Sequence, residues 1–231
     1  MEIAVINEST RISDADVAFA TRACAQQAEE FCAAWGIPQT AVAFYARGTA
    51  IPVTTTHAMV LVDDIGDPGI LGFHDVDEGV IYGRVLVQGD YQATSVTLSH
   101  EVLELLGDPR CNEWAPWTGT RMQAREAADR VEGDTYVETA TILGETRGVN
   151  VSNYLLPSAF VPGSAGPWDR MGRLTSWDGM THGGYVIVRD EAGNVSNVFA
   201  SRAVPDGFYR KLVNPRSRTL RRLRGEKGPT P

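Results

Sequence analysis

The segment from Ser99 to Glu104 holds the residues whose types and spacing best suit metal chemistry. It reads Ser99-His100-Glu101-Val102-Leu103-Glu104. On a helix, residues four apart point the same way, with Cβ atoms about 5–6 Å apart. An imidazole at His100 and a carboxylate at Glu104 can therefore reach one divalent ion. Glu101, the next residue round the helix, would stand beside that ion without ligating it, where a general base is needed.

An exposed amphipathic helix is the alternative interpretation of the same segment. The sequence predicts a helix over about Thr94 to Leu106, ended by Gly107-Asp108-Pro109. Its polar residues face away from one apolar stripe, formed by Leu98, Val102, Leu105 and Leu106. In that case the glutamates would only solvate the outer face. Asp108 would either cap the turn that follows or hold a metal ligand in place from behind.

The elements before this helix must supply the sheet on which it packs. The sequence predicts a first strand over Glu2 to Asn7 and a long helix from a cap at Ser13 to a stop at Gly36. Further strands are expected at Ala41–Tyr45, Ala58–Val62 and Val80–Val87, and later at Tyr136–Ile142, Val149–Leu155 and Tyr185–Val188. The fold class is therefore α+β, with a mixed sheet, two helices and a β-rich C-terminal part.

The segment His100-Glu101-Val102-Leu103-Glu104 resembles the H-E-x-x-H active-site helix of the zincin metallopeptidases. The preceding strands and long helix are similar to the zincin N-terminal subdomain. The resemblance covers about Ala41 to Asp129. Glu104 stands where that family has its second histidine. The resemblance implies a zincin-like fold and a metal-dependent hydrolase that acts on peptide bonds.

The gluzincin branch of that family takes its third ligand from a glutamate further along the chain. Arg125-Glu126-Ala127-Ala128-Asp129 stands at about the corresponding distance. The resemblance therefore implies His100, Glu104 and Glu126 as ligands, with Asp129 supporting a ligand from behind. It also implies a divalent metal, with Zn²⁺ as the first choice. A set with one histidine and two carboxylates is harder than the usual zinc set, so Mn²⁺ and Fe²⁺ are the alternatives.

An active hydrolase also needs a donor for the oxyanion that forms on the substrate. The candidates are His182, in the Gly179–Gly184 loop, and Tyr154. The strand Val80–Val87 is expected at the edge of the sheet, where an extended peptide substrate could pair with it.

A second histidine precedes that strand. His74 lies in the acidic sequence Phe73-His74-Asp75-Val76-Asp77-Glu78. A solvated histidine in a loop is the favoured interpretation, and a ligand or substrate contact is the alternative.

The charge of the chain is divided unevenly. The whole sequence has 21 basic and 29 acidic residues, but the segment 210–231 holds eight basic residues and one acid. The body is therefore strongly acidic, which argues against nucleic-acid binding by it. The basic tail is expected to dock on a protein partner or a neighbouring subunit. No apolar stretch suits a membrane span, and the N-terminus lacks the features of a signal peptide, so synthesis in the cytoplasm is expected.

Three parts are expected: a zincin-like subdomain over 1–131, a subdomain rich in strands and loops over 132–209, and the tail over 210–231. The Ser-His-Glu segment, the Asp-Pro after it and the later Val151-Ser152-Asn153-Tyr154 also resemble segments of uncharacterised phage-associated proteins. The first functional hypothesis is the metal-dependent hydrolase. The second is a catalytically silent structural protein, in a phage particle or similar assembly, that keeps the zincin-like fold. The third is a plain α/β binding module.

Overall fold

The computed structural model describes residues 2–52, 55–66, 70–77 and 79–200. The first part of the chain forms β1 (Glu2–Asn7), α1 (Asp14–Trp35), β2 (Ala41–Tyr45), β3 (His57–Val62), β4 (Gly72–Asp77), β5 (Val80–Leu86) and α2 (Tyr91–Gly107). The second part forms β6 (Trp114–Pro116), β7 (Met122–Ala124), η1 (Asp129–Val131), β8 (Thr135–Ile142), β9 (Glu145–Ser152), η2 (Pro157–Phe160), β10 (Tyr185–Arg189) and β11 (Val195–Phe199). The chain is thus an α+β protein. The basic tail 210–231 lies outside the described residues.

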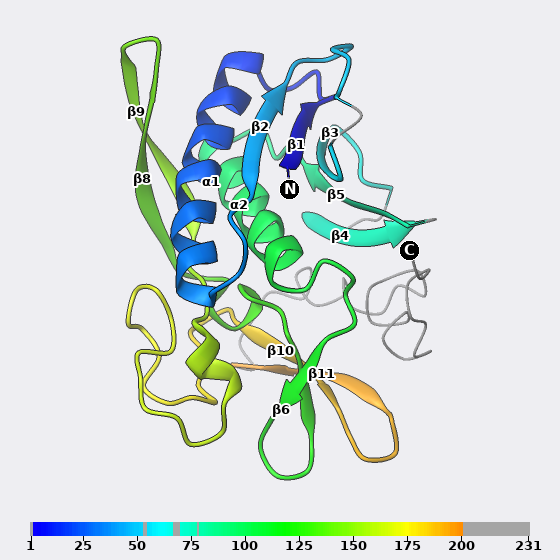
Figure 1. Ribbon diagram of the computed structural model, residues 1–231, viewed down its shortest axis with the longest axis vertical. Coiled ribbons are helices and arrows are strands. Elements are labelled where there is room, and N and C mark those ends of the chain that lie inside the picture. The colour runs from blue at the N-terminus through cyan, green and yellow to red at the C-terminus, as the bar shows by residue number, and fades with distance from the viewer. Residues whose placement is uncertain (1, 53–54, 67–69, 78, 201–231) are drawn as a thin grey trace.

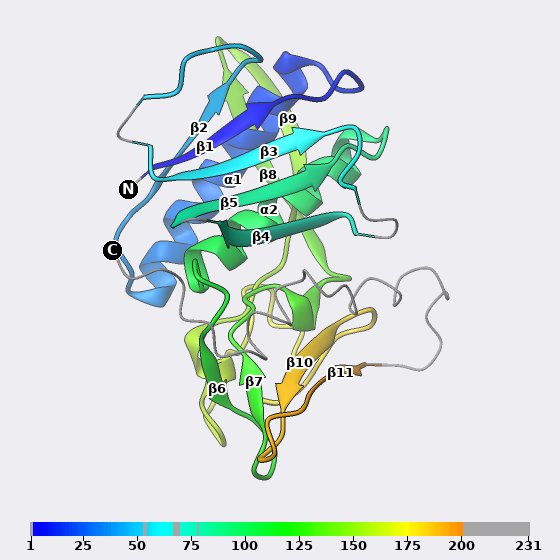
Figure 2. The ribbon, with the colours of Figure 1, turned by 90° about the vertical axis from the view of Figure 1, so that its right-hand side faces the viewer.

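A five-stranded sheet with the order β2-β1-β3-β5-β4 forms one side of the molecule (Figure 2). β1, β2, β3 and β5 run parallel, while β4 pairs antiparallel with β5. The prediction that the strand Val80–Val87 is an edge is wrong, because β5 pairs with β3 on one side and with β4 on the other. The edge next to β5 is β4, which continues into β5 through the turn at Gly79, where φ is 87°.

Both helices start and stop where local chemistry sets their ends. Ser13 caps α1 by accepting a hydrogen bond from the N–H of Asp16, and Gly36 ends it in the left-handed conformation, as the sequence predicts. Asp90 caps α2 by accepting from the N–H of Gln92, so α2 begins one turn before the predicted Thr94.

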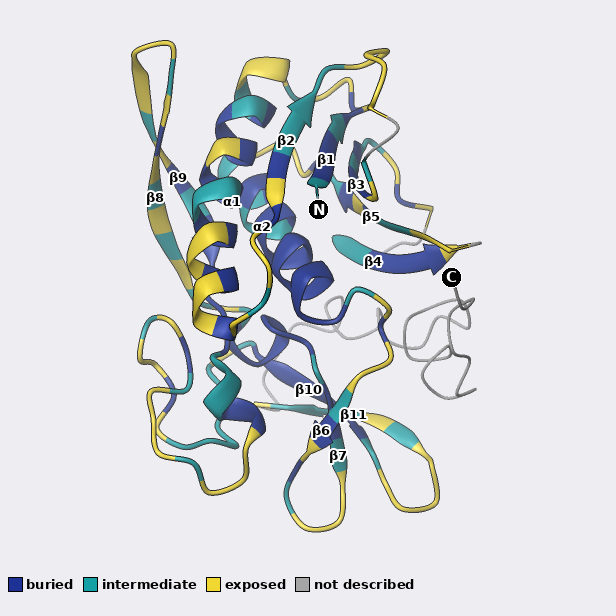
Figure 3. Ribbon diagram, in the orientation of Figure 1, coloured by how far each residue is buried: buried dark blue, intermediate teal, exposed yellow. Residues whose placement is uncertain are grey.

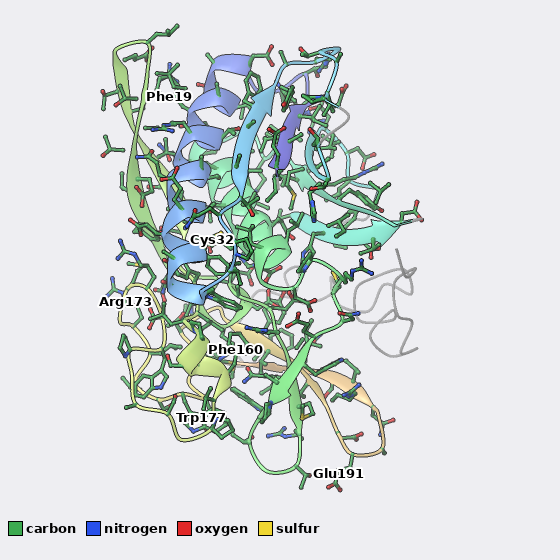
Figure 4. The ribbon with its side chains drawn as sticks, viewed as in Figure 1. Phe19, Cys32, Phe160, Arg173, Trp177 and Glu191 are labelled. Carbon is green, nitrogen blue, oxygen red and sulfur yellow. The ribbon has the colours of Figure 1, made fainter. Side chains whose placement is uncertain are left out.

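The helices lie between the sheet and the long β8–β9 hairpin (Figure 1). Two serines of α2 join it to β9: the Ser95 hydroxyl donates to the carbonyl of Asn150, and the N–H of Ser152 donates to Ser99 Oγ at 2.7 Å. On α1, Phe19 packs under the hairpin and beneath the Arg147 guanidinium (Figure 4). This arrangement covers α2 on both faces.

Burial of α2 therefore extends to its polar side. Figure 3 shows α2 largely buried, whereas α1 keeps an exposed outer face. The interpretation of Ser99–Glu104 as an exposed amphipathic segment is wrong, since His100, Glu101 and Glu104 are all buried. Carboxylates are expensive to bury, so their presence in the interior needs a compensating partner.

The second part of the chain adds a smaller antiparallel sheet, β11-β10-β7-β6, below the first (Figure 2). It is not separated from the first part by a break in the core. The Trp35 indole donates to the carbonyl of Leu155 at 2.9 Å, and Leu155 and Phe160 belong to the same apolar cluster as α1 and α2. The core thus continues across the boundary predicted at residue 131. Among the described residues, neither helix has the length and apolar character needed to cross a lipid bilayer.

Candidate metal centre

Three side chains of α2 form the centre of the candidate site. His100 and Glu104 are one turn apart, and His100 Nε2 lies 3.1 Å from Glu104 Oε1. The side chain of His100 is 10% exposed and that of Glu104 is fully buried, so His100 is the member nearest to solvent. Glu101 is also buried and lies on the other side of Glu104 from His100, towards β4. The helix therefore places all three as the residue spacing predicts.

The third member of the His100 group is Asp129, the first residue of η1. Its Oδ1 lies 3.3 Å from His100 Nε2, and suitable ligand atoms of His100, Glu104 and Asp129 lie within 4.8 Å of one another. Glu126 is buried close enough for its charge to act on Asp129, but it is not in this group. The sequence had assigned Glu126 as the ligand and Asp129 as its support. The structure places Asp129 against His100, where it can support that histidine or share an ion with it.

Asp129 reaches this position because the segment around it is tied to the core. The N–H of Leu155 donates to the carbonyl of Ala127 at 2.7 Å, which fixes the residues before η1. The Arg130 guanidinium then donates to the carbonyls of Ala159, Trp177 and Gly179, which anchors η1 to the long loop after β9. These contacts span distant parts of the chain.

A second group contains His74, which the sequence placed in a solvated loop. That interpretation is wrong: His74 lies in β4 and is fully buried. Its Nδ1 lies 3.6 Å from Glu101 Oε2 and 3.9 Å from Glu104 Oε2. Glu104 therefore belongs to both groups, one on each side of its carboxylate.

The turn after α2 holds His74 in place. His74 Nε2 lies 3.1 Å from the carbonyl oxygen of Asp108, and because a carbonyl only accepts, Nε2 must carry the proton. The Asp108 carboxylate accepts from the N–H groups of Asn112 and Glu113, so this side chain caps the turn. Cys111 adds a bond from its thiol to the carbonyl of His74. Asp108 thus supports the site through its backbone.

The spacing of these atoms suits the coordination sphere of a cation. Zinc bonds to nitrogen and oxygen are about 2.0–2.2 Å long, which puts neighbouring ligand atoms of a tetrahedral site about 3.3–3.6 Å apart. The distances of 3.1 and 3.3 Å from His100 Nε2 to its two carboxylates are close to that range. Asp129 Oδ2 accepts no hydrogen bond within the described part of the chain, although the residue is 1% exposed. The donor set therefore fits a divalent ion.

The pKa values of His100 and Asp129 also indicate that the buried carboxylates require a nearby positive charge. Burial raises the pKa of Asp129 well above its usual range, and the neighbouring charges of Glu104 and Glu126 raise it further against the effect of His100. Burial lowers the pKa of His100, but the carboxylates of Glu104 and Asp129 outweigh burial and raise it well above its ordinary value. Without a metal, protons must supply the missing positive charge.

The backbone of β4 leaves space for Glu101 only because residue 72 is a glycine. A Cβ atom on Gly72 would lie 2.7 Å from Glu101 Cγ and 2.8 Å from Glu101 Oε1 and from Thr97 Cγ2.

We expect Gly72→Ala to push α2 from β4 and to lower the free energy of unfolding by about 1–3 kcal/mol. Urea unfolding measures this. Gly107→Ala is the control, since a Cβ there meets only ordinary contacts of 3.4 Å or more; equal loss in both variants would contradict the prediction.

The two oxyanion donors suggested by the sequence lie elsewhere. Tyr154 is a core residue whose ring packs edge-on against Phe31, with centroids 5.2 Å apart. Burial and, to a smaller extent, the charge of Glu30 raise its pKa to about 12. His182 is exposed in the loop before β10. His182 belongs to neither of the two groups of side chains described above.

His74 is the residue for which the sequence favoured the wrong environment, a solvated loop, over the alternative of a ligand or substrate contact. A turn signal at Asp77-Glu78-Gly79, directly before a strong strand, could have indicated a hairpin and so placed His74 in a strand.

Comparison of the chain with protein-family models, curated proteins and solved structures found no match.

Proposed function

We propose that this protein is a metal-dependent hydrolase of zincin type, acting on peptide or similar amide bonds. The observation that carries the proposal is the convergence of His100, Glu104 and Asp129 in the interior, with Glu101 beside them. Their ligand atoms have the spacing that a divalent ion requires. The zincin-like character of the fold is part of the proposal.

The donor set indicates the kind of ion. One imidazole and two carboxylates suit zinc, and they also suit manganese or ferrous iron, which prefer harder ligands. Ionised carboxylates bind metal in place of protons, so binding is expected to release the protons that His100 and Asp129 hold without it. When bound, the ion lowers the pKa of a water molecule and polarises the substrate carbonyl.

The residues of the chain supply the remaining chemistry. Glu101 accepts a proton from the attacking water as the water oxygen bonds to the carbonyl carbon. Glu101 then gives that proton to the leaving nitrogen as the carbon–nitrogen bond breaks. The products are a carboxylic acid and an amine, so one water molecule is consumed and Glu101 returns to its starting state. Gly72 and the neighbouring α2 turn hold its side chain in place.

Metal content of the full chain tests the proposal. Protein purified without chelator is analysed by elemental mass spectrometry beside His100→Ala, Asp129→Asn and His57→Ala. His57 is the matched control, since it is a buried histidine in β3 that belongs to neither group. We expect a bound ion in the wild type and in His57→Ala, and loss of the His100 ion in the other two variants.

Turnover is tested on a library of fluorogenic peptides. Glu101→Gln is the matched variant, because it leaves His100, Glu104 and Asp129 in place and replaces the carboxylate that takes the proton. We expect the rate to fall by about 10²–10⁴-fold. Absence of metal from every well-folded sample would contradict the whole proposal.

A structural ion is the second candidate. The near-complete burial of Glu104 and Asp129 favours it, because structural metal sites are closed whereas catalytic sites keep an open position. Such an ion would join α2 to η1 without turnover. A bound ion, large loss of stability on chelation and no cleavage of any peptide would select this candidate. A role in a phage particle stays a prediction from the sequence.

A further inference from the structure

We propose that the protein binds a second divalent cation between His74, Glu101 and Glu104, so that the Glu104 carboxylate bridges two ions. This inference rests on the proposed function, because it adds an ion beside the one assigned to His100. The chain would then have a two-metal centre, built from β4, α2 and η1.

The two oxygens of Glu104 point to different partners. Oε1 lies 3.1 Å from His100 Nε2, and Oε2 lies 3.9 Å from His74 Nδ1. Each oxygen is thus shared with a different histidine. A carboxylate placed in this way is suited to bridge two cations, which in two-metal sites lie about 3.5–4 Å apart.

The imidazole of His74 is oriented for ligation. Its Nε2 donates to the Asp108 carbonyl, so in the neutral ring Nδ1 has a lone pair, and that atom is directed towards Glu101 and Glu104. The distance from Nδ1 to Glu101 Oε2 is 3.6 Å, within the range expected for two ligands of one zinc-like ion, and the distance to Glu104 Oε2 is 3.9 Å, a few tenths of an ångström above it.

Charge balance also favours two ions. Four carboxylates are buried in or beside the centre, those of Glu101, Glu104, Glu126 and Asp129, while the buried carboxylate of Asp108 is stabilised by two N–H groups. One divalent ion with neutral histidines leaves a formal charge of about −2 in the interior, which is costly in a low dielectric. Two divalent ions neutralise the four carboxylates.

The second ion is compatible with the role of Glu101. A carboxylate that ligates through one oxygen is a weaker base than a free one, but the lone pairs of its other oxygen can still accept a proton. The substrate would then bind next to two cations at one face of α2. Two-metal sites of this kind suit the hydrolysis of amide bonds and of phosphate esters.

Stoichiometry tests the inference on the full chain. Metal-free protein is titrated with Mn²⁺, and bound ions are counted by elemental mass spectrometry and by electron paramagnetic resonance. We expect two ions per chain with the coupled signal of a Mn²⁺ pair. His74→Ala and the polar variant His74→Asn should each bind one ion and lose the coupled signal. Asp129→Asn should also bind one, and His57→Ala should keep two.

The outcomes separate the inference from the proposed function. One ion in the wild type, unchanged in folded His74→Ala and His74→Asn, would overturn the second site and leave the first. No ion in any sample would overturn both. Circular dichroism confirms that each variant is folded, and His74→Asn keeps a polar group at that position if the alanine variant does not fold.

Discussion

Glu104→Gln is expected to weaken metal binding by about 100-fold or more, at both groups of the centre. Glu104 is the one residue that belongs to both groups, with one oxygen near His100 and the other near His74. Glutamine has nearly the same shape but no charge, and its amide nitrogen cannot ligate. Even supporting residues of metal sites cost 10–100-fold in affinity when replaced, so a central ligand is expected to cost at least as much.

The measurement is a competition titration of the metal-free protein against a chelator of known affinity. Glu138→Gln is the control, because Glu138 is a half-buried glutamate on β8, away from the centre. Burial raises the pKa of its carboxyl group, as it does for the carboxyl groups of the centre. Its loss should leave the affinity unchanged. Equal metal affinity in the Glu104→Gln protein and the wild type would show that Glu104 does not ligate.

Arg130→Met is expected to have the largest effect on stability, lowering the free energy of unfolding by about 3–5 kcal/mol. Arg130 is 1% exposed and donates to the carbonyls of Ala159, Trp177 and Gly179. Methionine fills much of the same volume but leaves these buried carbonyls without a donor. Burial lowers the pKa of Arg130 to about 10, so it stays charged at neutral pH.

Arg189→Met separates the hydrogen bonds from the stacking. Arg189 lies over Trp114 at 4.5 Å, much as Arg130 lies over Trp117 at 4.8 Å, so both variants lose a cation–π contact. We expect Arg189→Met to cost about 1 kcal/mol or less. Urea unfolding of both proteins gives the comparison, and similar losses would mean that the carbonyl network contributes little. Because Arg130 follows Asp129 directly, its replacement should also weaken metal binding.

The sequence by itself determined the local structure of the two helices, including the helix that carries the site. The cap at Ser13, the stop at Gly36 and the apolar stripe of α2 depend on interactions within a few residues, and all are present in the structure. The spacing of His100 and Glu104 fixes their relation in the same way, since any α-helix places residues four apart together. The α+β class followed from these elements and from the strongest strands.

Only the tertiary structure decided which distant residues join that helix. His74 reads locally as part of an acidic loop, and its burial depends on the pairing of β4 with β5 and on the turn after α2. The sequence also placed Val80–Val87 at an edge, because the position of a strand in a sheet depends on long-range pairing that periodicity does not encode.

The placement of Asp129 against His100 depends on long-range contacts in the same way. Glu126 and Asp129 are three apart, and on an α-helix both would face one side. In the structure Glu126 lies in the loop after β7, whereas Asp129 begins the short η1 helix and lies 3.3 Å from His100. The contacts that fix this loop come from Leu155 and from the Arg130 network, which join segments far apart in the chain. Local spacing determined the helix that carries the candidate site, and long-range packing brought Asp129 and His74 to it.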